Sequence, residues 1–182
     1  MLTIKLSEYE IYNEYINKFT IYPSITIELE HSLVSLYKWE AKWNIPFLHI
    51  KDFTAEQYED YIRCMILKMP SEPTFMLGLT PENAKEIQDY ISHPMTATKT
   101  TNYSKSESSS TKKSIITAEV IYSQMIANNI PFECQYWHLN QLTTLIKVCN
   151  IKNNQDKMPK KEVDQRNAEI NAQRRAKYNS KG

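Results

Sequence analysis

Cysteine and histidine are the residues of this sequence whose side chains could bind a transition metal. Cys134 and His138 are four positions apart, and Cys149 follows farther along the chain. Zinc sites usually combine two closely spaced pairs of ligands, and no second pair occurs here. The other three histidines are scattered, at His31, His49 and His93. The spacing therefore predicts a packed helix with a hydrogen-bonded histidine, and we expect neither a metal nor another cofactor.

Catalytic groups are the next candidates, because Cys134 and His138 could also form a nucleophile and its base. No glycine flanks Cys134, and no turn beside it is suited to stabilising an oxyanion. Glu119 and Glu133 lie near the two ends of the helical hairpin that is expected between Ser114 and Asn150. Carboxylates at such positions are more often helix caps or solvated side chains than an acid and base pair. The sequence therefore favours a protein that is not an enzyme.

Glycine is scarce in this chain of 182 residues, where it occurs only at Gly78 and Gly182. A Gly-rich phosphate loop, a G-x-G-x-x-G turn and a nucleophile elbow all need glycine at defined positions. Nucleotide chemistry of those kinds is therefore excluded.

The C-terminal end carries the positive charge of the chain. From Lys157 onward there are eight Lys or Arg residues against three acids, and the preceding part has 14 against 18, a net charge of −4. If the tail is helical, Arg166, Arg174 and Arg175 could contact the phosphates of a nucleic acid. The acids between them favour a solvated helix of mixed charge over a nucleic-acid-binding one.

A helical hairpin from Ser114 to Asn150 is expected to position many of these side chains. Apolar residues keep helical spacing in both halves, and Asn128 and Pro131 interrupt them. The expected buried stripe contains Ile116, Val120, Met125 and Ala127, then Leu139, Leu142, Ile146 and Cys149. We expect the two helices to pack antiparallel and to form the core with the helix of residues 31–43.

The first thirty residues alternate apolar and polar side chains as strands do, most clearly at Ile25, Ile27 and Leu29. A turn at Pro23 precedes that run. Residues 8–20 fit either a strand or a helix, because their tyrosines and isoleucines favour strands whereas their glutamates favour a helix. The sequence thus predicts a small N-terminal β element.

Three amphipathic helices are predicted after the β element. The first covers residues 31–43. The second opens with a capping box at Thr54 and continues through Leu67. The third covers residues 80–92 and begins with threonine, proline and glutamate, which are suited to the N-cap and the first helical turn.

The predicted fold is mostly α with a small N-terminal β element, in the α+β class. Residues 1–98 and 114–152 would form one domain with a sizeable core. Residues 99–113 contain one aromatic and no aliphatic side chain, so we expect a flexible polar loop. Residues 153–182 would form a basic polar tail.

The cysteine count and the hydropathy pattern indicate the compartment. Three cysteines, an odd number, lie in apolar contexts, which is typical of a reducing environment. No run approaches the ~18 apolar residues that cross a bilayer, and the N-terminus lacks the pattern of a signal peptide. We expect a cytosolic, unprocessed protein with no membrane partner.

Aromatic residues are the candidates for contact with a protein partner, because the chain has 12 tyrosines and 3 tryptophans. Amphipathic rings of this kind are often half-buried or reach a partner. The candidate partner-binding residues are Trp39, Trp43, Phe47, Tyr136 and Trp137, together with Arg166, Arg174 and Arg175 of the tail.

An ordered series of motifs over residues 25–182 resembles the tail assembly chaperones of tailed bacteriophages. The order is the specific part, since each motif alone is weak. Gln141 and Thr143 depart from the arginine and the aliphatic residue of that family. The matching segments are Trp39-Glu40-Ala41-Lys42-Trp43, Ile45-Pro46-Phe47-Leu48, Met95-Thr-Ala-Thr98, Ile130-Pro-Phe-Glu-Cys134, Trp137-His-Leu-Asn140, Leu145-Ile-Lys-Val-Cys149, Arg166-Asn167-Ala168, Asn171-Ala172-Gln173-Arg174-Arg175 and Lys181-Gly182.

The resemblance implies a non-enzymatic protein made in the cytoplasm of the infected host. Such a chaperone binds the tape-measure protein, helps to recruit the tail tube protein, and is absent from the mature virion. Self-association is a further expectation. Two other classes stay open, namely a structural head-tail or tail component that remains in the virion, and a nucleic-acid-binding protein that uses the basic tail.

Overall fold

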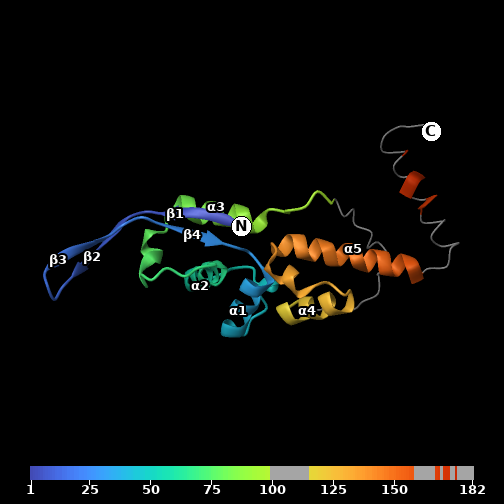
Figure 1. Ribbon diagram of the computed structural model, residues 1–182, viewed down its shortest axis with the longest axis horizontal. Coiled ribbons are helices and arrows are strands. Elements are labelled where there is room, and N and C mark those ends of the chain that lie inside the picture. The colour runs from blue at the N-terminus through green and yellow to red at the C-terminus, as the bar shows by residue number, and fades with distance from the viewer. Residues whose placement is uncertain (99–114, 158–166, 169, 173–174, 176–182) are drawn as a thin grey trace. The chain divides into compact units, whose positions relative to one another are not determined.

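The computed structural model describes residues 1–98, 115–157, 167–168, 170–172 and 175, so the expected loop at residues 99–113 lies outside the described part. The described chain is mostly helical with four N-terminal strands (Figure 1), which confirms the predicted class. With 3-10 helices labelled η, the elements are β1 (Leu2–Leu6), β2 (Tyr9–Asn13), β3 (Lys18–Tyr22), β4 (Ile25–Leu29), α1 (Leu33–Trp43), η1 (Phe47–His49), α2 (Ala55–Met65), η2 (Phe75–Gly78), α3 (Pro81–Ser92), α4 (Ala118–Ala127), η3 (Phe132–Tyr136) and α5 (Leu139–Lys157).

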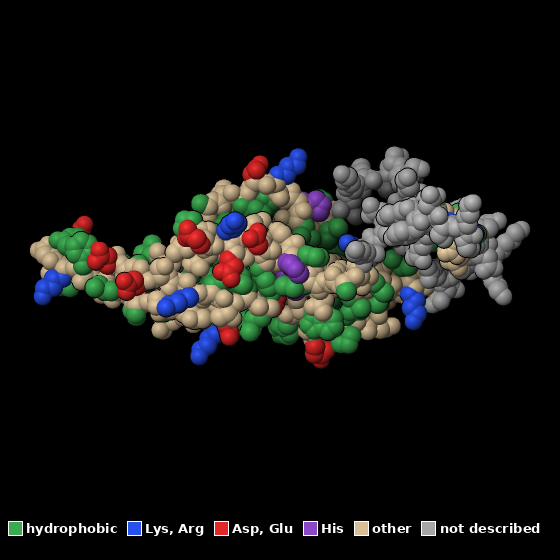
Figure 2. Space-filling view, turned by 90° about the horizontal axis from the view of Figure 1, so that it is seen from above, with side chains coloured by type: hydrophobic (Ala, Val, Ile, Leu, Met, Phe, Trp, Pro, Cys, Tyr) green, Lys and Arg blue, Asp and Glu red, His purple; other side chains and the backbone are tan. Residues whose placement is uncertain are grey.

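The four strands form two separate antiparallel ladders. In the first, β1 pairs with β4, which sets Ile4 opposite Ile27. In the second, β2 pairs with β3, which sets Tyr9 opposite Tyr22 with their rings stacked 4.9 Å apart. The residues that fitted either a strand or a helix are therefore a hairpin, because aromatic side chains pair across it. We call β2, β3 and their turn the ribbon, and Figure 2 shows hydrophobic side chains at its free end.

Helices α2 and α3 begin where their caps predict. Thr54 and Thr80 each accept a hydrogen bond from the backbone N–H three residues later, and both complete a capping box. Helix α2 ends at Met65, two residues before the predicted end, because Ile66 leaves the helix and forms a β bridge with Leu29. Local sequence thus sets the starts of α2 and α3, whereas a tertiary contact sets the end of α2.

A hydrophobic core cluster of buried side chains lies between the β1–β4 ladder and the helices α1, α2 and α3. A strand buries one face, so the inward residues of β1 and β4 supply one side of the cluster. The expected hairpin contributes other buried residues and is not part of it. The members are Ile4, Leu6, Ile27, Leu29, Trp39, Tyr61, Ile62, Met65, Ile66, Phe75, Met76, Ile87 and Tyr90.

Helix α4 buries a different stripe from the one predicted. Ala118, Ile121 and Met125 are buried, whereas the predicted Ile116, Val120 and Ala127 are exposed. The segment is apolar on several sides, so spacing alone does not select the inward face. Its packing against α1 makes that selection, and the predicted stripe is wrong for Ile116, Val120 and Ala127 and right for Met125.

The chain divides into two compact units, Met1–Thr144 and Leu145–Gly182, with the boundary inside α5. Leu139 and Leu142 are buried in the first unit, and Ile146 is buried in the second, as their spacing predicts, whereas Cys149 of the same predicted stripe is only half-buried. The predicted tail boundary at residue 153 stays a prediction. The surfaces discussed below belong to the first unit.

Candidate partner-binding surface

An exposed aromatic surface forms where α1, α4 and η3 come together. Tyr122 of α4 lies at its centre, with ring centroids 6.2 Å from Tyr37 of α1 and 6.5 Å from Phe132 of η3. Tyr136 lies at the other end of η3. Ile126 follows Tyr122 by one helical turn and therefore shares its face of α4. We call these five residues the Tyr122 patch.

Most of the Tyr122 patch is accessible to solvent. Tyr37 is 45%, Phe132 54%, Ile126 61% and Tyr136 62% exposed, and Tyr122 is half-buried among them. A group of large apolar side chains on a protein surface is typical of a site that contacts another molecule. This arrangement makes the patch our candidate for the functional site.

Tyr122 is held in place by its hydroxyl group, which donates a hydrogen bond to Oε1 of Gln135 at 2.9 Å. Burial raises the pKa of Tyr122, and the nearby phenols of Tyr136 and Tyr37 add to the rise. The hydroxyl therefore stays protonated and keeps donating at neutral pH. The patch is thus an apolar surface whose central side chain, Tyr122, is held in position by the hydrogen bond to Gln135.

Glu40 of α1 positions α4. This buried carboxylate accepts a hydrogen bond from Ala118 N at 2.7 Å through Oε2, and one from Phe47 N at 2.8 Å through Oε1. The first N–H groups of a helix have no partner within the helix, and a carboxylate satisfies them well. Glu40 therefore joins the start of α4 to α1, which brings Tyr122 next to Tyr37.

The turn after α4 directs the aromatic residues of η3 outward. Asn129 adopts a left-handed conformation with φ 53°, and the N–H of Ile130 bonds to Met125 O at 2.9 Å. In η3, Cys134 is buried, so Phe132 and Tyr136, two residues on either side, face solvent. A short helix with one buried residue thus presents two exposed rings.

Three of the predicted partner-binding residues occupy packed positions. Trp39 is fully buried, and its Nε1 donates to a backbone carbonyl of α2 at 2.9 Å. Phe47 is half-buried, with its ring centroid 4.1 Å from that of Tyr61. Trp43 is half-buried, and its Nε1 donates to Asp60 Oδ2 at 2.8 Å. Trp39 stabilises the core and is closed to a partner, which corrects the prediction for that residue.

The other predicted residues divide between exposed and undescribed positions. Tyr136 and Trp137 are exposed, and Tyr136 belongs to the Tyr122 patch. Arg175 is exposed in the second unit. Arg166 and Arg174 lie outside the described residues.

Tyr37, Tyr122, Ile126 and Phe132 were not identified from the sequence. Tyr37 follows the buried Leu36 directly, so a helical turn of about 100° per residue moves it off the inward face. The same geometry separates Tyr122 from the buried Ile121. Once the buried face of a helix is known, Tyr37 and Tyr122 can be recognised as exposed neighbours of buried residues. The sequence alone did not show which face of α4 is buried.

Two of the histidines, His31 and His138, are buried and make structural contacts. His138 is buried, accepts at Nδ1 from Asn140 N at 3.3 Å, and therefore donates from Nε2 to Tyr90 O at 3.1 Å. Burial raises the pKa of the Cys134 thiol, which disfavours the thiolate that a nucleophile or metal ligand needs. Within the described part of the chain, no three His, Cys, Asp or Glu residues are grouped to hold a metal ion.

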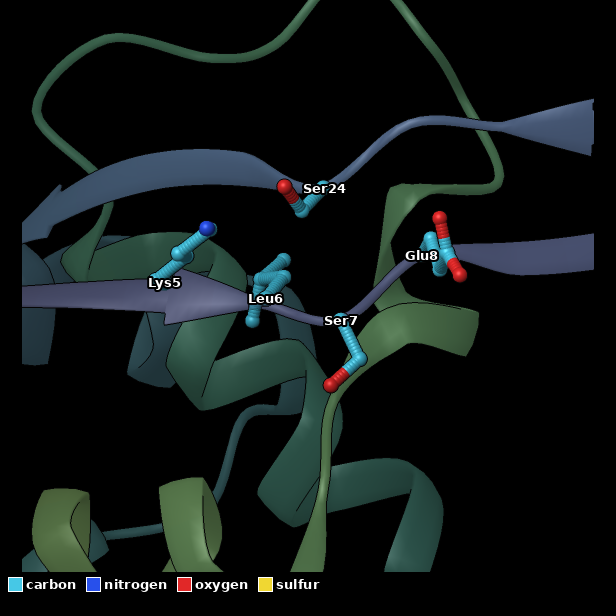
Figure 3. Close-up of a pocket in the computed structure, with 5 residues that line it drawn as sticks. All are labelled: Lys5, Leu6, Ser7, Glu8 and Ser24. Atoms are coloured by element: carbon cyan, nitrogen blue, oxygen red, sulfur yellow. The ribbon is translucent and has the colours of Figure 1, made fainter.

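An open hollow of about 410 Å³ lies where the two ladders separate. Figure 3 shows the residues that line it, namely Lys5, Leu6, Ser7, Glu8 and Ser24. They come from the end of β1 and the two connections into the ribbon. Its one lysine and one glutamate do not form a catalytic arrangement, but the hollow marks the base of the ribbon.

No helix in the described residues is both long and apolar enough to cross a membrane. No family model matches the chain, and no curated protein or solved structure matches it either. Its functional interpretation therefore depends on the ordered motifs and on the exposed surface described above.

Proposed function

We propose that this protein is a non-enzymatic tail assembly chaperone of a tailed bacteriophage, which binds the tape-measure protein and supports assembly of the tail tube. The Tyr122 patch is the observation that carries the proposal. It presents Tyr37, Phe132 and Tyr136 to solvent on short helices whose positions are fixed by buried contacts. The order of the motifs supplies the class of client.

A tape-measure protein is a suitable client for such a patch. A long helical chain that is not yet packed exposes apolar stripes, which aggregate unless another surface covers them. Amphipathic helices bind apolar surfaces through side chains spaced three or four residues apart. In the proposed complex, one such stripe lies over Tyr122 and contacts the rings on either side of it.

The proposed setting is the cytoplasm of the infected host, and the chaperone is absent from the finished virion. Its basic tail, which includes the exposed Arg175, adds a salt-dependent share of binding, since solvated charges are screened beyond about 8 Å at physiological ionic strength. The apolar contacts at the patch depend less on salt.

Co-expression with the tape-measure protein of the same phage tests the proposal. The wild-type chain should raise the soluble fraction of the tape-measure protein, and the double variant Tyr37→Ser/Phe132→Ser should lose most of that effect. Leu77→Ser is the matched control, because Leu77 is an exposed apolar residue of η2, outside the patch. The control variant should behave as wild type.

Two results would contradict the proposal. One is a tape-measure protein whose solubility is unchanged by the wild-type chain. The other is the presence of this chain at fixed copy number in purified virions, which would establish the structural-component alternative.

A further inference from the structure

The ribbon formed by β2 and β3 has no covering layer among the described residues. Its two strands pair only with each other, so both outer edges are free in this part of the chain. The base of the ribbon is anchored, because Ser7 N donates to Gly78 O and the Tyr9 hydroxyl lies 2.9 Å from Thr74 Oγ1. Figure 1 shows the rest extending away from β1 and β4.

One face of the ribbon is strongly apolar. Tyr12, Phe19 and Ile21 lie on it and are 47%, 63% and 69% exposed, and the rings of Tyr12 and Phe19 are 5.0 Å apart. The turn adds Tyr15, which is 99% exposed, and Ile16, which is 57% exposed. An isolated two-stranded hairpin is only marginally stable in water, and a free edge readily pairs with another strand. The ribbon therefore has the properties of a docking element.

We propose that the ribbon binds the ribbon of a second copy of this chain, with the two β3 strands antiparallel about Thr20. The register follows from the sequence Lys18-Phe19-Thr20-Ile21-Tyr22. Thr20 faces its own equivalent, and Phe19 of each copy faces Ile21 of the other. Pairs of an aromatic and a β-branched residue are favourable across strands. The product is a four-stranded sheet with six apolar side chains on one face.

The same register also places the turn of one ribbon next to the hollow at the base of the other ribbon. Ile16 is four residues before Thr20, and Ser24 is four residues after it. In an antiparallel pair centred on Thr20, the turn of one copy therefore comes level with Ser24 of the other. Ser24 lines the hollow at the base of the ribbon (Figure 3), so Tyr15 and Ile16 lie beside a recess that can receive them.

The available area is sufficient for a specific dimer. Fully exposed side chains of this size carry on the order of 200 Å² each. The exposed parts of the five apolar residues then add up to roughly 1,300 Å² for two copies, of which a specific interface needs to bury about 1,000 Å². Pairing through β2 would be poorer, because centring on Ile11 sets the charged Glu10 opposite Tyr12 beside the centre, whereas in β3 the charged Lys18 lies opposite Tyr22 at the ends of the pair. The choice of β3 thus follows from its composition.

Sedimentation equilibrium of the full chain tests the dimer. The wild-type chain should be dimeric at tens of micromolar, and Ile21→Ser should raise the dimer Kd by at least about tenfold, which is the loss of one good apolar contact. Ile126→Ser is the matched control, since Ile126 of the Tyr122 patch is 61% exposed. A monomeric wild type at about 100 µM, or equal effects of the two variants, overturns the proposal.

Oxidative cross-linking tests the register. Thr20→Cys should form a disulfide between copies, because equivalent atoms on the symmetry axis lie within the distance that a disulfide spans. Lys18→Cys should not, because four residues of strand, about 13 Å, separate the two equivalent positions. The wild-type chain measures the background from its own three cysteines. Equal cross-linking of the two variants rules out pairing about Thr20.

This inference does not depend on the proposed function. Loss of the dimer in Ile21→Ser and loss of tape-measure binding in Tyr37→Ser/Phe132→Ser concern different residues and different measurements. Either proposal can therefore fail while the other holds.

Discussion

Glu40 and Ala118 are separated by 78 positions in the sequence and joined by one buried hydrogen bond, from Ala118 N to Glu40 Oε2 at 2.7 Å. The other carboxylate oxygen accepts from Phe47 N at 2.8 Å. A single side chain of α1 therefore fixes both the segment that follows α1 and the start of α4. The position of the Tyr122 patch depends on that side chain.

Glu40→Gln should destabilise the protein by about 1–3 kcal/mol, which is the cost of a buried polar group left without its partner. The amide has one oxygen instead of two, and its NH₂ group would face an N–H donor. Urea unfolding measures the change. Hydrogen exchange should also speed up at the first amides of α4, because their anchor is lost.

Glu86→Gln is the control for Glu40→Gln, since Glu86 is exposed on α3 and should tolerate the change within about 0.5 kcal/mol. A Glu40→Gln protein as stable as this control would show that the carboxylate does not anchor α4.

Gly78 lies against the end of β1, and a Cβ placed there would be 2.4 Å from Ser7 O. Ser7 N also donates to Gly78 O at 2.9 Å, so the two backbones cannot separate without losing that bond. Gly78→Ala should therefore cost about 1–3 kcal/mol, as overpacking usually does. The Tm of Gly78→Ala in thermal unfolding measures this loss of stability. Ala97→Gly, at an exposed position, is the comparison variant. An unchanged Tm would show that the base of the ribbon adapts freely.

His31 and His138 form a buried edge-to-face pair with ring centroids 5.1 Å apart. Burial lowers the pKa of His31 from 6.5 to about 3 and also lowers the pKa of His138. Around them lie Tyr61, whose hydroxyl is 2.5 Å from His31 Nδ1, and Tyr90, whose hydroxyl donates to Glu30. Both imidazole rings are therefore neutral in the native chain at neutral pH.

At these two histidines the unfolded chain binds more protons than the native chain below pH 6.5, so their contribution to the free energy of unfolding should fall as the pH falls below that value. His31 alone should lower it by about 2 kcal/mol between pH 7.5 and pH 5.0. Urea unfolding at the two pH values measures the loss, and His31→Asn should reduce it. His49→Asn, at an exposed position, is the matched control for the substitution itself. The same pH dependence in His31→Asn and wild type would contradict this account.

Leu142 is fully buried on α5. Leu142→Ala should lower the free energy of unfolding by about 2–5 kcal/mol, through lost burial and the cavity that remains. Gln141→Ala on the same helix is the control, because Gln141 is exposed. A loss below about 0.5 kcal/mol for Leu142→Ala would place this residue outside the core.

The sequence by itself determined where α2 and α3 begin and where α4 ends. Thr54 and Thr80 cap their helices through bonds to residues three positions away, and Asn128 ends α4 through a bond to Gln124. Such contacts are local, so residue type and spacing suffice to predict them. The burial of Leu142 also followed from spacing, because α5 has a clear apolar stripe there.

Only the tertiary structure decided which aromatic residues face solvent. Trp39 and Tyr37 lie two positions apart on α1, yet Trp39 is fully buried and Tyr37 is 45% exposed. Periodicity shows that a helix has an apolar side, but contacts with distant segments select the side that is buried. For α1 and α4, that selection comes from their packing and from the bond between Glu40 and Ala118. The Tyr122 patch therefore arises from a long-range contact that residue spacing cannot encode.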